Sequence, residues 1–172
     1  MKKCIYILDT SAILSGKPLN FNENKIISSE LIKNEIRPGG KDYKNFLYLL
    51  EQGLILVKPK IKSINEIKEI SKRTGDISRL SKVDIEILAI GFEYDKNNSN
   101  VIILSDDYSI QNIASFLKIK YEIVSQKGIT KRFKWIYRCQ GCGKKFKDNI
   151  KICPICGAKT KTVISKKSDI NR

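Results

Sequence analysis

Five carboxylates stand beside the ends of regular segments in this sequence, and together they could bind divalent metal ions. Asp9 directly follows an apolar run, Glu35 lies near the end of a helical pattern, and Asp84 lies near the start of another. Asp106 and Asp107 follow a second apolar run. Carboxylates gathered in one pocket repel each other unless they hold cations. Two such ions can activate a water and stabilise the leaving oxygen, so the set predicts metal-dependent hydrolysis of a phosphodiester.

Most of these carboxylates also have a purely structural interpretation, as helix caps. Asp9 could cap a helix that follows the first apolar run, and Asp106 or Asp107 could cap a later one. Asp84 follows Ser81 by three residues, which is close to a capping box. Taken singly, each residue fits a cap at least as well as a ligand, so the metal interpretation depends on their convergence.

The sequence contains no histidine, and this absence narrows the possible chemistry. It excludes a Ser-His-Asp triad, a Cys-His pair and a ribonuclease that uses histidine as acid and base. Hydrolysis would therefore depend on carboxylates, lysines or bound metal ions.

Four of the five cysteines form two C-x-x-C pairs near the C-terminus. Cys139 and Cys142 make the first pair, Cys153 and Cys156 make the second, and ten residues separate the pairs. Two tight turns of this kind place four thiolates around one tetrahedral Zn²⁺ ion. Four thiolates leave no open position, so we expect one structural zinc ion that folds a segment too small to form its own core.

The elements that must position these residues alternate between strands and helices. Such alternation predicts an α/β fold with a parallel sheet flanked by helices. Because chemistry gathers at the carboxyl ends of parallel strands, Asp9 should lie beside Asp106 and Asp107. We expect Ser28 to cap the first of the longer helices. The expected strands are 4–8, 25–27, 54–57, 101–104 and 121–124, and the expected helices are 28–36, 42–52, 63–72, 81–94 and 109–117.

Charge divides the 172 residues into two unequal parts. Residues 1–126 hold 19 Lys or Arg and 16 Asp or Glu, whereas residues 127–172 hold 14 and 2. A nearly neutral body with a strongly basic end indicates contact with a polyanion such as nucleic acid. We expect a catalytic domain over 1–126, a basic linker over 127–134, a zinc ribbon over 135–160 and a mobile basic tail over 161–172.

The basic end combines cations with aromatic side chains in a pattern that suits single-stranded RNA. Phe133, Trp135 and Tyr137 alternate along a strand and share one face, which could stack on bases or dock the ribbon on the main domain. Lysines and arginines of the same region could contact backbone phosphates. The candidate RNA-binding residues are Lys131, Arg132, Lys134, Trp135, Arg138, Lys144, Lys145 and Lys147.

Four segments resemble the motifs of PIN-domain ribonucleases, in the same order along the chain. They are residues 9–11, 28–36, 80–89 and 103–108. With the four-cysteine ribbon after them, the whole resembles the archaeal Nob (Nin-one-binding) family of endoribonucleases. That family matures the 3′ end of small-subunit ribosomal RNA.

The resemblance implies a PIN fold and an endoribonuclease that depends on Mn²⁺ or Mg²⁺. By motif position, Asp9, Glu35 and Asp84 would be metal ligands. The common Thr-x-Asp pattern points to Asp107 as the fourth, with Ser105 in place of the threonine, but the adjacent Asp106 leaves this choice open. The implied partners are precursor small-subunit ribosomal RNA and the pre-ribosomal particle.

Two other functions fit parts of the sequence. One is a toxin-type PIN ribonuclease, which would cut a small RNA and need an antitoxin, although that role has no evident need for a ribbon. The other is a non-catalytic RNA-binding adaptor whose acids are only caps. We expect a cytoplasmic protein, because no apolar run approaches the ~20 residues that span a membrane and the first run is too short for a secretion signal. A hinge near Gly128 could hold the free enzyme inactive.

Overall fold

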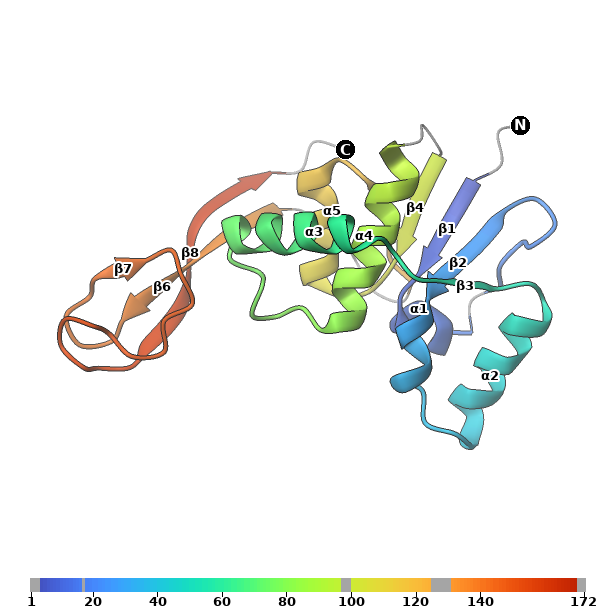
Figure 1. Cartoon of the computed structure of the whole chain (residues 1–172), viewed down its shortest axis with the longest axis horizontal. Helices are drawn as coiled ribbons and strands as arrows, with labels where there is room; N and C mark the ends of the chain where they lie inside the picture. The colour runs from blue at the N-terminus through green and yellow to red at the C-terminus, as the bar shows by residue number, and fades with distance from the viewer. Residues whose placement is uncertain (1–3, 17, 97–99, 125–130, 170–172) are drawn as a thin grey trace.

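The computed structural model describes residues 4–16, 18–96, 100–124 and 131–169, with only the backbone described at 131, 132 and 167–169. It consists of an α/β body, residues 4–124, and a long antiparallel extension (Figure 1). The expected hinge near Gly128 lies outside the described residues.

A five-stranded parallel sheet forms the centre of the body and confirms the expected fold class. Its strand order is β3-β2-β1-β4-β5, so the chain runs outward in one direction from β1 and in the other from β4. The boundary between β1 and β4 is therefore the topological switch point, where open α/β sheets bind ligands. The strands are β1 Cys4–Leu8, β2 Lys25–Ser29, β3 Ile55–Val57, β4 Asn100–Leu104 and β5 Lys120–Glu122.

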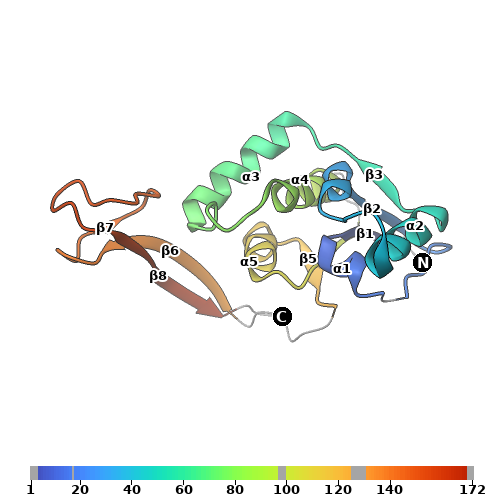
Figure 2. The same ribbon diagram turned by 90° about the horizontal axis from the view of Figure 1, so that it is seen from below.

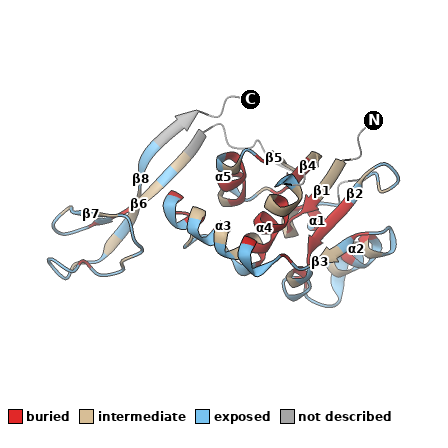
Figure 3. Ribbon diagram, turned by 45° about the horizontal axis from the view of Figure 1, so that its top comes forward, coloured by how far each residue is buried: buried red, intermediate tan, exposed pale blue. Residues whose placement is uncertain are grey.

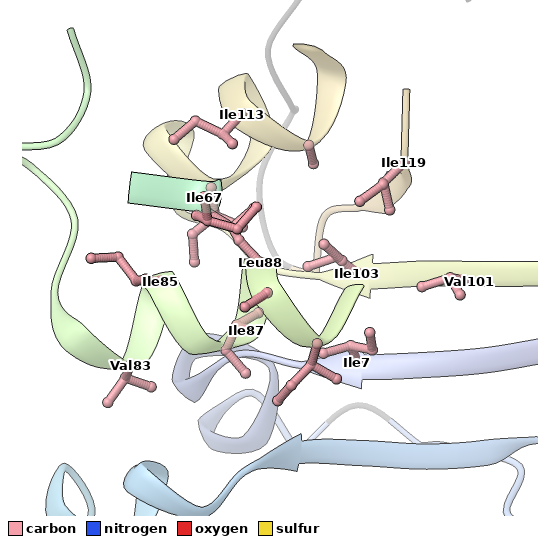
Figure 4. Packing of buried hydrophobic residues seen from close by; sticks show 14 of the residues in the cluster. Ile7, Ile67, Val83, Ile85, Ile87, Leu88, Val101, Ile103, Ile113 and Ile119 are labelled. Atoms are coloured by element: carbon pink, nitrogen blue, oxygen red, sulfur yellow. The ribbon is translucent and has the colours of Figure 1, made fainter. Parts of the chain in front are cut away.

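Helices cover both faces of this sheet because alternate strand residues point to opposite sides. Ile7 and Ile103 pack with α3, α4 and α5, as Figure 4 shows from close by. Leu8 and Leu104 pack with α1 and α2 on the other face. The helices are α1 Thr10–Leu14, α2 Gly40–Glu51, α3 Ile61–Thr74, α4 Lys82–Lys96 and α5 Tyr108–Leu117.

One expected helix differs in type and in its cap. The segment after β2 is a short 3₁₀ helix, η1, over Glu30–Asn34, and its N-cap is Ser29 rather than Ser28. The Ser28 hydroxyl instead donates to the carbonyl of Leu8 at 2.7 Å, which ties β2 to the end of β1. Because β2 continues to Ser29, the helix η1 with its N-cap begins one residue later than the sequence pattern predicts.

The C-terminal region departs from the expected linker and mobile tail. β6 (Lys131–Cys139) pairs with β8 (Thr160–Asp169), and the short β7 (Lys145–Phe146) pairs with β6. Residues 131–134 pair with 166–169, and residues 135–138 pair with 161–164, so both segments are strands. We call paired β6 and β8 the arm, and residues 139–160 at its outer end the ribbon (Figure 2).

Burial distinguishes the two parts of the molecule. Buried residues concentrate in the sheet and the helices packed on it, whereas most of the ribbon surface is exposed (Figure 3). The ribbon accordingly depends on its cysteines rather than on an apolar core of its own. Within the described part of the chain, no helix is long and apolar enough to cross a membrane.

Candidate active site and cysteine cluster

Asp9 lies at the switch point, on the residue that follows β1. Leu8 is in register with Leu104, and the Asp9 amide donates to the Leu104 carbonyl at 3.0 Å. The Asp9 side chain is 5% exposed, and its Oδ2 accepts hydrogen bonds from Ser11 at 3.0 Å and Ser105 at 2.8 Å. Its Oδ1 accepts from the Thr10 amide at 2.7 Å, which makes Asp9 the N-cap of α1. These donors hold the carboxylate in one orientation and leave a lone pair of Oδ1 available.

The two acids after β4 have different partners. Asp107 is exposed and caps α5, since its Oδ1 accepts from the amides of Ser109 at 2.5 Å and Ile110 at 3.3 Å. Asp106 instead directs Oδ1 to the amide of Val124 at 2.8 Å, just beyond β5. The geometry therefore gives Asp106 a role in fixing the chain after β5 and leaves Asp107 beside the switch point.

Asp84 approaches the same region from the first turn of α4. It forms a capping box with Ser81: the Ser81 amide donates to Asp84 Oδ2 at 2.6 Å, and the Asp84 amide donates to the Ser81 hydroxyl at 3.1 Å. The capping box thus fixes the orientation of the Asp84 side chain.

Glu35 joins the site through Thr10. It is the C-cap of η1 and is exposed, and its Oε2 accepts a short hydrogen bond from the Thr10 hydroxyl. Thr10 follows Asp9 directly, so this bond brings the end of η1 to the start of α1. Glu35 is therefore linked to the other three carboxylates through the residue next to Asp9.

The electrostatics of the inner carboxylates fit a bound cation. Burial raises the pKa of Asp9 above its ordinary value, and the charge of Asp107 raises it further, although hydrogen bonds from Ser105 and Ser11 oppose the rise. Burial also raises the pKa of Asp84, with added contributions from Asp9 and Asp107. Three acids that disfavour one another's charge would be relieved by a divalent cation with oxygen ligands.

The acids are nevertheless not drawn into a tight cluster. Among the described residues, one group of three or more His, Cys, Asp or Glu side chains has ligand atoms that all lie within 4.8 Å of one another. This group consists of the four cysteines. Asp9, Asp84 and Asp107 are therefore spaced more widely than the cysteines, and their assignment as metal ligands stays a prediction.

The four cysteine sulfurs converge at the end of the arm. Cys139 and Cys156 have sulfurs 3.3 Å apart, and those of Cys142 and Cys153 are 3.7 Å apart. Ligands ~2.3 Å from a tetrahedral zinc ion are separated by about 3.8 Å, so the arrangement suits one such ion.

Each C-x-x-C turn has the backbone conformation that its glycine allows. Gly143 and Gly157 have φ of +75° and +72°, a left-handed conformation that glycine adopts without strain. The amide of Gly141 also donates to the Cys139 sulfur at 3.3 Å. Each turn therefore depends on the glycine that follows its second cysteine. In the first turn, Gly141 between the two cysteines also contributes.

On one face of the arm, cationic side chains of β6 lie opposite cationic side chains of the neighbouring strands. Lys134 of β6 is in register with Lys166 of β8, and Arg138 is in register with both Lys161 and Lys145. All five side chains are exposed, and none forms an ion pair within the described part of the chain. Like charges directly opposite one another are destabilising in a sheet, so this face is suited to a polyanion.

The remaining predicted RNA-binding cations lie on the ribbon or outside the described side chains. Lys144 and Lys147 are exposed on either side of Lys145 in β7. The side chains of Lys131 and Arg132 lie outside the described residues. The ribbon therefore extends the basic surface of the arm.

The aromatic face of β6 packs against the body. The Arg79 guanidinium lies 3.6 Å from the centre of the Trp135 ring, and the Tyr137 hydroxyl bonds to Ser78 at 2.9 Å. Asn112 of α5 clamps β6 by donating to the Phe133 carbonyl and accepting from its amide, each at 2.9 Å. Trp135 is thus part of a docked face, and its contact with RNA stays a prediction.

The site contains features that the sequence did not reveal. Ser105, expected only to replace a threonine, bridges the acids, since its hydroxyl donates to Asp9 and accepts from the Asp107 amide at 3.0 Å. Lys161 and Lys166 lie on a strand where a mobile tail was expected, and only the β-branched residues of 160–164 favour a strand there. Glu86 is buried and accepts from Ser29, so its carboxylate is already engaged.

Comparisons with known proteins agree with the fold. A family model for the PIN domain of ribonuclease matches residues 6–94. Endoribonuclease Nob1 of Archaeoglobus fulgidus is 32% identical over 99% of this chain and 98% of its own length. Endoribonuclease Nob1 of Methanocaldococcus jannaschii is 32% identical over 91% of this chain and 76% of its own. Ribonuclease VapC1 of Thermoplasma acidophilum is 35% identical over 98% of this chain and 82% of its own.

Proposed function

The chain belongs to the PIN-domain ribonucleases and, within them, to the archaeal Nob1 endoribonucleases, and on this basis we propose that it cleaves precursor small-subunit ribosomal RNA at its 3′ end. It is an endoribonuclease, which sets aside the non-catalytic adaptor. The observation that supports this chemistry best is the position of Asp9 and Asp107 after the paired strands β1 and β4, at the switch point of the sheet, with Asp84 held by its capping box at the start of α4. The enzyme would act in the cytoplasm, on the pre-ribosomal particle.

The proposed ligands of the catalytic Mn²⁺ or Mg²⁺ are Asp9, Asp84, Asp107 and Glu35. When bound, the metal activates a water and stabilises the oxygen that leaves the phosphodiester. Ser11 and Ser105 hold Asp9 in its orientation, and the capping box holds Asp84. Of the two acids after β4, Asp107 is the proposed ligand.

The proposed metal of the ribbon is one zinc ion per chain, bound by Cys139, Cys142, Cys153 and Cys156. Its role is structural, since four thiolates complete the tetrahedral shell. By ordering the ribbon, the zinc ion fixes the loops that carry Lys144, Lys145 and Lys147.

The proposed RNA-binding surface is the face of the arm on which cations oppose cations, together with the ribbon. Phosphates placed between Lys134 and Lys166, or between Arg138 and Lys161, would relieve the repulsion of each pair. These contacts are independent of base sequence, so they would orient the RNA without selecting it.

Cleavage of a small free RNA is the second candidate, because one relative of nearly full length has the ribonuclease name VapC1. That match spans 98% of this chain and so includes the ribbon region. A basic arm of this size fits a large structured RNA better than a short substrate, which favours the ribosomal proposal.

Mapped cleavage of two RNAs distinguishes the candidates. One labelled RNA spans the 3′ end of small-subunit ribosomal RNA, and the other has the same composition in scrambled order. Each is incubated with the full chain and Mn²⁺, and without added Mn²⁺ or Mg²⁺, since a chelator would also remove zinc. A metal-dependent cut at the mature 3′ end alone supports the proposal. Equal cutting of the scrambled RNA would overturn it in favour of a less selective ribonuclease.

A further inference from the structure

A cavity of about 280 Å³ lies at the seam where the arm meets α5. Its volume is close to the lower limit of ~300 Å³ for small-molecule sites, so one nucleobase fits it better than a larger ligand. The lining combines aromatic, amide and charged groups from α5, the α3–α4 connection and β6. These residues are Asp76, Arg79, Tyr108, Ser109, Asn112, Phe133 and Trp135.

Part of this lining is already engaged in holding the arm. Asn112 donates to Asp76 Oδ2 at 2.8 Å, and Asp76 is only 1% exposed. Phe133 and Trp135 pack with ring centres 5.8 Å apart at an interplanar angle of 41°. These contacts make the back wall of the cavity rigid, as a preformed binding site requires.

Other lining side chains remain accessible to a ligand. Arg79 stacks on Trp135 and its charge also acts on Asp76, but its side chain is exposed and forms no ion pair within the described part of the chain. Tyr108 is 54% exposed, and its hydroxyl and that of Ser109 have no hydrogen-bond partner among the described residues. An exposed guanidinium beside an exposed aromatic ring is the combination that binds a phosphate and its adjacent base.

The cavity lies next to one of the proposed catalytic acids, Asp107. Tyr108 and Ser109 directly follow Asp107, so the cavity begins at the N-terminus of α5, where the proposed metal ligand lies. A strand of RNA with its phosphodiester beside Asp107 would therefore have a neighbouring nucleotide within reach of Tyr108 and Arg79.

We propose that this cavity is a nucleotide subsite, in which one base of single-stranded RNA stacks on Tyr108 while Arg79 binds its phosphate. This inference rests on the proposed function for the presence of RNA at Asp107, and it adds a base contact that the arm lysines do not provide. The subsite would hold a nucleotide next to the cut and so limit where the strand can enter the active site.

Binding of short oligomers without catalysis tests the subsite. The full chain, with its zinc retained and no Mn²⁺ or Mg²⁺ added, is titrated into a labelled uridine octamer and into an abasic oligomer with the same number of phosphates. Anisotropy of the label gives the affinity. Trp135 is the only tryptophan of the chain, so its fluorescence reports whether the cavity is occupied. We expect the octamer to bind at least about 5-fold more tightly than the abasic oligomer and to change the Trp135 fluorescence.

Two variants with matched controls locate the contact. Tyr108→Ala should weaken octamer binding by about 5- to 150-fold, the range of base–aromatic stacking, and leave abasic binding unchanged. Tyr48→Ala, at a tyrosine of α2 that is 59% exposed, should change neither. Arg79→Gln should weaken binding of both oligomers, whereas Arg73→Gln in the last turn of α3 should not. Unchanged melting temperatures would show that the variants fold.

Equal affinity for the two oligomers, or an unaffected Tyr108→Ala variant, would overturn the subsite and leave the cavity as a gap in the seam. Neither result depends on cleavage or on ribosomal sequence. The subsite can therefore fail while ribosomal cleavage is confirmed, and it can be supported while the ribosomal substrate is wrong.

Discussion

Asp9, Asp84 and Asp107 each serve a helix terminus and also lie within electrostatic reach of one another. Asp9 and Asp107 are N-caps, and Asp84 belongs to a capping box. A cap uses one or two lone pairs of a carboxylate and leaves the others available for a cation. The structural and catalytic interpretations of these residues are therefore compatible. Residue types alone could not show this, because it depends on which oxygen meets which donor.

The choice between Asp106 and Asp107 leads to a prediction at single-residue scale. Asparagine keeps the oxygen that accepts each main-chain hydrogen bond but loses the charge that binds a metal. Asp107→Asn should therefore lower the single-turnover cleavage rate by on the order of 10²-fold, since a catalytic metal supplies several kcal/mol. Asp106→Asn, the matched control, should retain most of the rate. The reverse ranking of the two variants would make Asp106 the ligand.

The raised pKa of Asp9 predicts how its replacement changes stability with pH. A carboxyl whose folded-state pKa lies above the unfolded value of 3.8 favours folding below that value, and this contribution is lost as the pH rises through the folded pKa. At pH 7 and low divalent metal, the ionised Asp9 thus opposes folding. Asp9→Asn should have an unfolding free energy equal to or above that of wild type under these conditions.

Denaturant titrations at several pH values measure this difference. The advantage of Asp9→Asn should shrink as the pH falls through the folded pKa of Asp9, because wild type then regains its own stability. Mn²⁺ should stabilise wild type and not the variant. A loss of more than about 1 kcal/mol in the variant at pH 7 would show that the hydrogen bonds of Asp9 outweigh the burial of its charge.

At the scale of elements, the body and strand β6 of the arm were predictable from sequence, whereas strand β8 was not. Apolar runs located the five parallel strands, because buried strands carry continuous β-branched residues. The segment 160–169 has few large apolar residues and many lysines, so it resembled a mobile tail. Its strand depends on pairing with β6, a long-range contact that local composition cannot reveal.

Docking of the arm predicts an effect of alanine at Gly75 that alanine at Gly39 lacks. Both glycines have positive φ, +84° and +85°, and alanine is strained at either position, at Gly39 (ψ 168°) more than at the left-handed Gly75 (ψ 9°). A Cβ on Gly75 would also lie 2.4 Å from the Trp135 carbonyl oxygen, whereas one on Gly39 has no atom within 4 Å.

Both variants should therefore lose stability, but only Gly75→Ala should shift the emission of Trp135 to the red as the seam opens. Chemical denaturation and intrinsic fluorescence measure the two effects. Unchanged Trp135 emission in Gly75→Ala would mean that the arm does not dock on the body as the structure has it.

At the scale of the whole molecule, a nearly neutral body carries an arm and ribbon dense in cations. The uneven charge was visible in the sequence, and it indicated the nucleic-acid partner correctly at the level of class. The direction of the basic face was not visible, because it depends on which side of β6 docks against α5 and the α3–α4 connection. Phe133, Trp135 and Tyr137 supply that side, and the cations are left facing solvent.

The arm surface predicts the salt dependence of RNA binding. Each cation removed from a contact with single-stranded phosphate lowers the slope of log K against log salt by about 0.7. Replacing Lys134, Arg138 and Lys145 together with glutamine should lower the slope by about 2. The same replacement at the exposed Lys41, Lys44 and Lys62 of the body should leave it unchanged. Anisotropy titrations over a series of KCl concentrations measure both, and an equal decrease in the two variants would remove the arm as the principal binding surface.

The central claim is that carboxylates at the switch point bind the metal that cleaves RNA, and a Mn²⁺ titration of cleavage tests it most directly. Single-turnover rates on the ribosomal 3′-end RNA are measured for wild type and Asp84→Asn, since asparagine keeps the hydrogen bond from Ser81 and removes only the charge. We predict that the wild-type rate rises with Mn²⁺ to a plateau and that Asp84→Asn is slower by on the order of 10²-fold across the range. Cleavage at the wild-type rate by Asp84→Asn, or wild-type cleavage that needs no divalent metal, would contradict the claim.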